Sequence, residues 1–164
     1  MTTDDFADVL AANHAYAAEV PRADLEARAA KGLAVLTCMD SRIEPLAMLG
    51  LVPGDAKILR NAGARVTDDV LRTLVPAAYL LGVERVMIVA HTGCRMSMPE
   101  EDIHAAILAA GGPDTRSISF LTSEDQESSL RTDVQRVRSW PYLTNITVGG
   151  FLYDLDSGRV RQVC

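Results

Sequence analysis

The chain has 164 residues, 48% of them hydrophobic, and a formal net charge of −6 at pH 7. This length predicts a single domain over residues 1–164, and the acidic balance argues against nucleic acid as a partner. No apolar run approaches the roughly 18 residues of a membrane span, and the first residues do not resemble a secretory signal. Three cysteines, an odd number, argue against a disulfide framework. We therefore expect a cytoplasmic protein without a membrane partner, whose thiols are free to bind metal or react.

The first elements expected along the chain are two helical stretches and a strand. Thr3 is placed to cap a helix that reaches to about residue 20, and its apolar face carries few large side chains. Such a face favours packing on a second subunit. Residues 24–31 predict a short second helical stretch closed by Gly32. The apolar run that begins at Leu33 then predicts a buried strand, which ends on Cys38.

The rest of the chain alternates between strands and helices. A helix starts after Thr67 and ends at Gly82, and Pro76 within it predicts a kink or a restart. Strands are expected over 56–60, 83–90, 146–153 and 159–163, and further helical segments over 44–49, 102–110 and 123–138. The alternation predicts an α/β fold with a mostly parallel central β-sheet flanked by helices and an antiparallel C-terminal edge strand.

Residues with metal-binding or acid–base side chains follow two of the predicted strands. Cys38 ends the first strand, with Asp40 and Arg42 just behind it, and His91 and Cys94 follow the 83–90 strand. Ligands of open parallel sheets bind at the carboxyl ends of the strands, so we expect these residues to meet. Two cysteines and one histidine supply three ligands, as in catalytic zinc sites that keep a fourth position for water. The spacing alone does not exclude iron or cobalt.

Each of these residues also has an ordinary interpretation. Buried cysteine is common in protein cores, a lone histidine is usually structural, and Asp40 with Arg42 could be a surface ion pair. Their conjunction at two strand ends is what favours a functional site. His14, His104 and Cys164 have no such partners nearby in the sequence, and we assign them no role.

Four motifs together resemble the ordered signature of the β-class carbonic anhydrases. In chain order they are Cys38-Met-Asp40-Ser-Arg42, Arg60-Asn61-Ala-Gly63, His91-Thr-Gly-Cys94, and Gly150-Phe-Leu-Tyr-Asp154 with Gly158. The resemblance covers about residues 33–163. It implies the reversible hydration of carbon dioxide to bicarbonate and a proton, with Zn2+ as the cofactor. It also implies a homodimer or dimer-based oligomer in which residues 1–20 pack on a partner subunit.

The resemblance further implies a role for each site residue. Cys38, His91 and Cys94 would bind zinc, and Asp40 with Arg42 would form the dyad of the family. Zinc lowers the pKa of bound water to about 7, so that zinc-bound hydroxide can attack carbon dioxide. Asp40, kept ionised by Arg42, would accept the proton of the hydroxide and orient it. Without Arg42, Asp40 could become a fourth ligand.

Arg95 departs from the family pattern, which usually has glycine after the second cysteine. Its side chain could point away, attract bicarbonate or occlude the pocket, and we expect zinc binding with reduced activity. The alternatives that the sequence leaves open are hydrolysis of carbonyl sulfide or carbon disulfide, and a catalytically silent zinc-binding protein. A thiol redox protein that uses Cys94 has less support, because the chain has no Cys-x-x-Cys.

Overall fold

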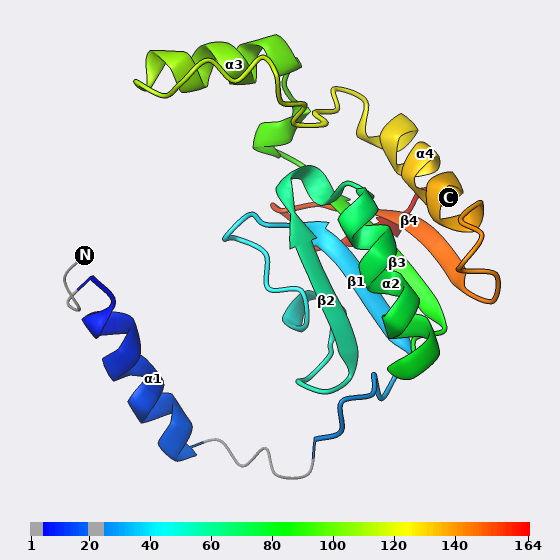
Figure 1. Cartoon of the computed structure of the whole chain (residues 1–164). Coiled ribbons are helices and arrows are strands. Elements are labelled where there is room, and N and C mark those ends of the chain that lie inside the picture. The colour runs from blue at the N-terminus through cyan, green and yellow to red at the C-terminus, as the bar shows by residue number, and fades with distance from the viewer. Residues whose placement is uncertain (1–4, 20–24) are drawn as a thin grey trace.

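The computed structural model describes residues 5–19 and 25–164. Its centre is a five-stranded sheet in the order β2-β1-β3-β4-β5 (Figure 1). Strands β1 to β4 are parallel, and β5 is antiparallel to β4. The strands are β1 Leu33–Cys38, β2 Ala56–Asn61, β3 Arg85–His91, β4 Thr147–Tyr153 and β5 Val160–Gln162. The predicted mostly parallel sheet with an antiparallel C-terminal edge strand is confirmed.

The described residues also form four α-helices and three single turns of 3-10 helix. They are α1 Ala7–Glu19, α2 Asp68–Leu80, α3 Glu100–Ala109, α4 Gln126–Arg138, η1 Ala47–Leu49, η2 Ala62–Ala64 and η3 Arg95–Ser97. The largest core cluster joins α2 and α4 to one face of the sheet, where Leu36 and Ile88 are fully buried. Successive strand side chains point to opposite faces. Val35 and Val89 therefore face the other way, where they pack with the segment around η1.

Side-chain caps set the beginnings of α2 and α4. The Thr67 hydroxyl accepts a hydrogen bond from the backbone N–H of Val70 at 3.3 Å, as the sequence predicts. Asp125 accepts from the N–H of Ser128 at 3.1 Å, and α4 therefore begins three residues later than predicted. Helix α2 continues through Pro76, so the expected restart does not occur. Its buried face packs on the sheet on both sides of the proline, which offsets the missing hydrogen bond.

The short helix predicted ahead of Gly32 is wrong for the part of it that the structure describes, residues 25–31. Backbone N–H groups that a helix would use internally are bound to distant segments instead. Ala29 donates to the carbonyl of Leu81 at 2.8 Å, and Lys31 donates to the carbonyl of Asp55 at 2.9 Å. Hydrogen bonds to distant segments thus replace the local helix and hold this segment near the residues that precede β2 and β3, at the amino-terminal ends of the parallel strands.

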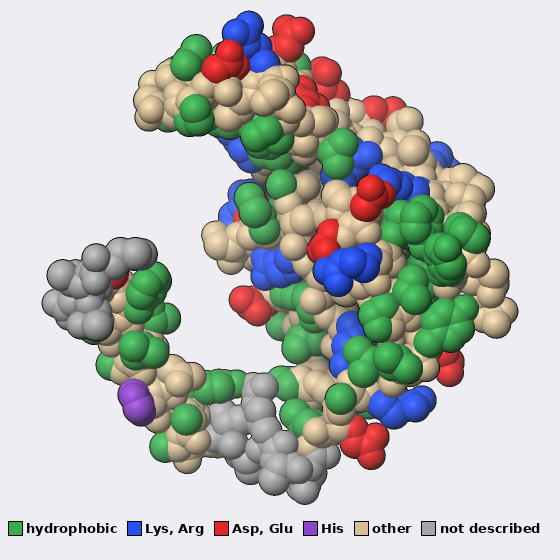
Figure 2. Space-filling view, in the orientation of Figure 1, with side chains coloured by type: hydrophobic (Ala, Val, Ile, Leu, Met, Phe, Trp, Pro, Cys, Tyr) green, Lys and Arg blue, Asp and Glu red, His purple; other side chains and the backbone are tan. Residues whose placement is uncertain are grey.

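Helix α1 lies away from the sheet and buries none of its residues (Figure 1). Figure 2 shows hydrophobic side chains along it, and Val9 and Leu10 are 58% and 57% exposed. The predicted cap, Thr3, lies outside the described residues. None of the described helices has the length and apolar character needed to cross a membrane.

Candidate metal centre

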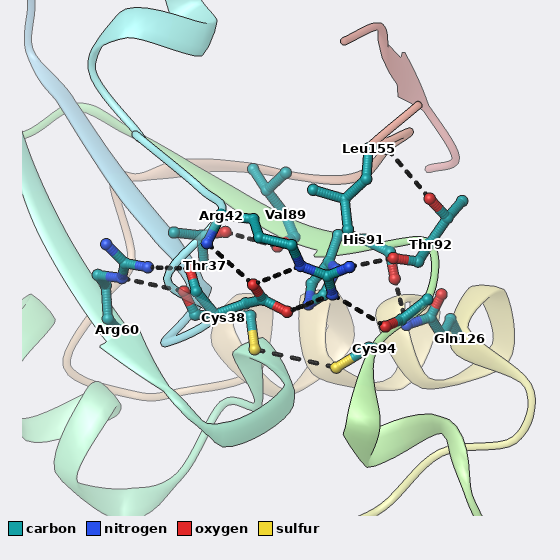
Figure 3. A network of polar contacts seen from close by, with 12 residues as sticks. Thr37, Cys38, Arg42, Arg60, Val89, His91, Thr92, Cys94, Gln126 and Leu155 are labelled. Carbon is teal, nitrogen blue, oxygen red and sulfur yellow. Dashed lines mark hydrogen bonds and ion pairs between the residues drawn. The ribbon is translucent and has the colours of Figure 1, made fainter. Parts of the chain in front are cut away.

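The predicted site forms where β1 and β3 end side by side. The two strands are parallel neighbours with Thr37 opposite Val89, and the Thr37 hydroxyl donates to the Val89 carbonyl at 3.1 Å. Cys38 and His91, the last residues of the two strands, therefore emerge at the same edge of the sheet. A turn after β3 then brings Cys94 back toward Cys38 (Figure 3). The structure thus brings together the three residues that the sequence proposed as ligands.

The three side chains form a compact and buried cluster. Their ligand atoms all lie within 4.8 Å of one another, and the two sulfur atoms are 3.9 Å apart. His91 is fully buried, and its Nδ1 lies 2.9 Å from the carbonyl oxygen of Thr92. That contact places the ring proton on Nδ1. Nε2, which faces the cluster, is then a lone-pair donor without any hydrogen-bond partner.

This donor set fits a zinc ion. Two sulfurs at about 2.3 Å from one tetrahedral zinc would lie about 3.8 Å apart, close to the observed 3.9 Å. A buried nitrogen without a partner is costly, and coordination would satisfy it. The two sulfurs and one imidazole suit zinc, and three protein ligands leave one position open for a reactant. Among the described residues, these three form the one group of this kind.

The two thiols differ in how readily they ionise. The hydrogen bond from the Cys94 thiol lowers the pKa of Cys38, and the nearby His91 ring lowers it further. The same contact raises the pKa of Cys94, and burial raises it too. Cysteine must be deprotonated to bind a metal. Cys38 ionises readily and can bind as a thiolate, whereas a metal ion would have to displace the proton of Cys94.

Asp40 and Arg42 form a paired side-chain unit at the rim of this cluster. Arg42 donates to the Asp40 carboxylate from Nε at 2.9 Å, from Nη2 at 2.6 Å and from its backbone N–H at 3.0 Å. Arg42 Nη2 also reaches the carbonyl oxygen of Gly93 at 3.2 Å. These contacts hold the pKa of Asp40 well below its usual range. The carboxylate is therefore ionised, and its Oδ2 lies 3.9 Å from Nε2 of His91.

A second Asp-x-Arg pair elsewhere in the chain has the same local geometry. Arg116 donates to Asp114 from its backbone N–H at 3.1 Å, from Nε at 3.0 Å and from Nη2 at 2.6 Å. The pKa of Asp114 is lowered in the same way. That pair lies in the exposed loop after α3. Asp40 therefore differs from Asp114 in its position beside Cys38, His91 and Cys94, and not in its pairing with an arginine.

Three residues that support the site were given no role by sequence reasoning. Arg60 donates from Nε to the Cys38 carbonyl at 3.0 Å and from Nη2 to the Asp40 carbonyl at 2.6 Å, which fixes the segment that carries both (Figure 3). Gln126 donates to the His91 carbonyl at 2.9 Å. The Thr92 hydroxyl accepts from the backbone N–H of Leu155 at 3.0 Å. Arg60 lies in a quoted motif, whereas nothing in the sequence marks Gln126.

A pocket opens beside the cluster, lined by Cys38, Met39, Asp40, Ser41, Ala62, Cys94, Arg95 and Met96. Arg95, the departure from the family pattern, is exposed and belongs to this lining. The residues left without a role lie elsewhere. His14 is exposed on α1, His104 contacts Thr115 and the ring of Phe120, and Cys164 packs against Gly150.

Comparisons with known proteins agree with this fold and site. Residues 33–160 match the family model described as "Carbonic anhydrase". The β-carbonic anhydrase 1 of Mycobacterium tuberculosis is 34% identical, and the match covers 99% of both chains. A carbonic anhydrase structure from Streptococcus mutans is 36% identical over 100% of both chains, with a TM-score of 0.90. The carbon disulfide hydrolase of Acidianus sp. is 40% identical over 78% of this chain and 75% of its own.

The chain therefore belongs to the β-class carbonic anhydrase family. Membership in this family makes it a carbonic anhydrase enzyme, with Cys38, His91 and Cys94 forming a possible metal site.

Proposed function

We propose that the protein catalyses the reversible hydration of carbon dioxide to bicarbonate and a proton, with zinc held by Cys38, His91 and Cys94. The observation that carries this proposal is the buried Nε2 of His91, which has no partner and lies beside two sulfurs 3.9 Å apart. A zinc ion bound there would lower the pKa of water toward 7 and so supply a nucleophile at neutral pH.

The residues of this chain then position the reactants. Asp40, ionised and within 3.9 Å of Nε2, is placed to accept a hydrogen bond from the attacking water and to turn its lone pair toward carbon. Arg42 keeps this carboxylate charged and holds it at the rim. Arg60 fixes the backbone between Cys38 and Asp40, so ligand and acceptor keep their relative positions.

Stopped-flow hydration of carbon dioxide by purified protein with quantified zinc tests this proposal. We expect about one zinc per chain and activity that rises with pH through the ionisation of bound water near pH 7. Zinc-loaded protein without activity anywhere between roughly pH 6 and pH 9 would favour a silent zinc-binding protein instead.

A second candidate keeps the fold and the metal but changes the substrate. Carbonyl sulfide and carbon disulfide are linear like carbon dioxide, and the relative from Acidianus sp. is named a carbon disulfide hydrolase. Turnover of the three substrates by one preparation decides between them. A kcat/KM for carbon disulfide above that for carbon dioxide would replace our proposal with this one.

We also propose that the protein is a homodimer or dimer-based oligomer in which α1 packs on a partner subunit. Helix α1 buries none of its residues, and the sheet face that α2 and α4 leave free has a hollow lined in part by Met87 and Phe151. Light scattering should give at least twice the chain mass of 17.7 kDa. Val9→Asp on α1 should shift the protein toward the single-chain mass, whereas Val52→Asp, on an exposed loop, should not.

We propose a reducing compartment, the cytoplasm, as the site of action. The described cysteines form no disulfide, and two of them are needed as thiolates for the metal. Fractionation of the source cells with an antibody against the protein would test this.

A further inference from the structure

Arg95 is the residue of the pocket whose role neither the fold nor the family explains. It follows Cys94 directly and begins η3, and it lines the same pocket as Cys38 and Asp40. With Arg95 in place the pocket keeps a volume of about 270 Å³. The side chain therefore does not fill the pocket, which remains open beside Cys38 and Cys94.

The guanidinium groups around this pocket differ in how their donors are used. Arg42 is bound to the Asp40 carboxylate, and Arg60 donates to the carbonyls of Cys38 and Asp40. The side chain of Arg95 makes no hydrogen bond or ion pair with any residue between 5 and 19 or between 25 and 164. Its five N–H donors and its charge thus remain available to a ligand.

Two sets of opposite charges in the site cancel. Two thiolates would cancel a divalent ion, and Asp40 cancels Arg42. The positive charges of Arg60 and Arg95 remain, and of these two residues only Arg95 keeps its side-chain donors free, at the wall of the pocket. A small anion would gain both a charge-assisted hydrogen bond and a favourable potential there, whereas neutral carbon dioxide would gain little.

We propose that Arg95 forms an anion subsite at the wall of this pocket, which binds bicarbonate and other small monovalent anions. The inference rests on the proposed function, because bicarbonate is the product of that reaction. The planar guanidinium matches the two oxygens of a carboxylate-like anion. Arg95 thus strengthens product binding and inhibition by anions relative to a chain with glycine at this position.

The test compares the wild type with Arg95→Gln and Arg95→Lys. Arg131→Gln is the matched control, because Arg131 is exposed on α4 and its loss changes the net charge equally. Thiocyanate is titrated into cobalt-loaded protein and followed by visible absorption, and the KM for bicarbonate is measured with zinc-loaded protein. We expect Arg95→Gln to raise the thiocyanate Kd and the bicarbonate KM about tenfold, the loss of one charge-assisted hydrogen bond at an exposed site. Arg95→Lys should lose less affinity than Arg95→Gln, because it keeps the charge but not the two-donor geometry of the guanidinium.

Two results would overturn the subsite. One is a thiocyanate Kd for Arg95→Gln within about twofold of the wild type, and the other is an equal weakening in Arg131→Gln. Hydration and dehydration share one equilibrium constant, so a variant must change kcat/KM for carbon dioxide and kcat/KM for bicarbonate by the same factor. Measuring both values therefore checks that the kinetic data are consistent. If the zinc-loaded wild type hydrates no carbon dioxide, the proposed function fails, and the thiocyanate titration still decides the subsite.

Discussion

Replacing Arg42 with glutamine tests how much catalysis depends on the hydrogen bonds that hold the Asp40 carboxylate in place, while Asp40 itself is kept. Three N–H groups of Arg42 reach the carboxylate, from the backbone at 3.0 Å, from Nε at 2.9 Å and from Nη2 at 2.6 Å. The substitution removes the two side-chain donors and keeps the backbone donor, which binds Oδ1. Oδ2 is then free to turn toward Nε2 of His91, from which it is separated by 3.9 Å.

We expect kcat to fall about 10- to 100-fold in Arg42→Gln, because a shift of about 1 Å in a positioned group can cost about 100-fold. Asp40→Asn, which removes the acceptor itself, should lose at least about 100-fold. Both variants keep the three ligands, so zinc content should stay at about one ion per chain. In cobalt-loaded Arg42→Gln, the visible spectrum should also change as the released carboxylate approaches the metal.

The assay is stopped-flow hydration at saturating carbon dioxide, with the metal quantified in each sample. Arg116→Gln is the matched control, because Arg116 holds Asp114 with the same three donors away from the cluster. It should retain full activity. A kcat for Arg42→Gln within about twofold of the wild type would refute the positioning role of Arg42. Loss of zinc from that variant would refute it too, because the defect would then lie in the metal site.

Three further predictions concern metal binding, stability and pH. Cys38→Ser should lose zinc and activity together, measured by elemental analysis and hydration. Asp133→Ala should lower the free energy of unfolding by about 3 kcal/mol in urea titration, because it leaves Arg65, 16% exposed, without its partner at 2.8 Å. The N–H of Phe120, bound to Glu100 at 2.6 Å, lowers the pKa of that carboxyl. This contact is therefore present above the ordinary pKa of glutamate and is lost as the pH falls through the lowered value. The protection of the Phe120 amide against hydrogen exchange, taken relative to its intrinsic rate at each pH, should fall as the pH is lowered stepwise from about 6.

Each of these predictions has a control in the same chain. Cys164→Ser should keep zinc, because its sulfur packs against Gly150 and lies outside the cluster. Asp69→Ala removes a pair whose two side chains are both 75% exposed, and it should cost less than about 1 kcal/mol. Glu100→Gln should make the protection of the Phe120 amide, which is its exchange rate relative to the intrinsic rate at each pH, insensitive to this pH change. Loss of zinc in Cys164→Ser, or equal destabilisation by the two aspartate variants, would contradict the structural argument.

The strands and the clustering of Cys38, His91 and Cys94 could be predicted, because apolar runs indicate the strands and parallel strands end on the same side of a sheet. The run from Leu33 to Cys38 is apolar except for Thr37 and becomes a strand in which every residue is buried. Parallel neighbours end at the same edge, so Cys38 and His91 had to meet once their strands were adjacent. By contrast, the helix predicted before Gly32 is absent, since Ala29 and Lys31 donate to segments that are distant in the sequence. Propensity carries no information about such partners.

The supporting contacts of the site could not be predicted for a related reason. Gln126 reaches the carbonyl of His91 only because α4 packs on β3 and β4 at a particular height. That height depends on Gly150, where a Cβ would lie 3.2 Å from a methyl of Val134 and 3.3 Å from Cβ of Leu130. The glycine stands in a quoted motif, and the structure adds its reason, the close approach of α4 to β4.

The two Asp-x-Arg pairs show what a short motif does and does not determine. In both, the spacing alone produces the same three hydrogen bonds and the same lowering of the aspartate pKa. Local geometry is thus encoded within three residues, and it recurs in an exposed loop where Asp114 belongs to no group of three metal-binding side chains among the described residues. Asp40 differs because it follows the end of β1, where its carboxylate lies beside Nε2 of His91. Arg42→Gln and Arg116→Gln therefore break two equivalent pairs, and only Arg42→Gln, at the end of β1, should affect catalysis.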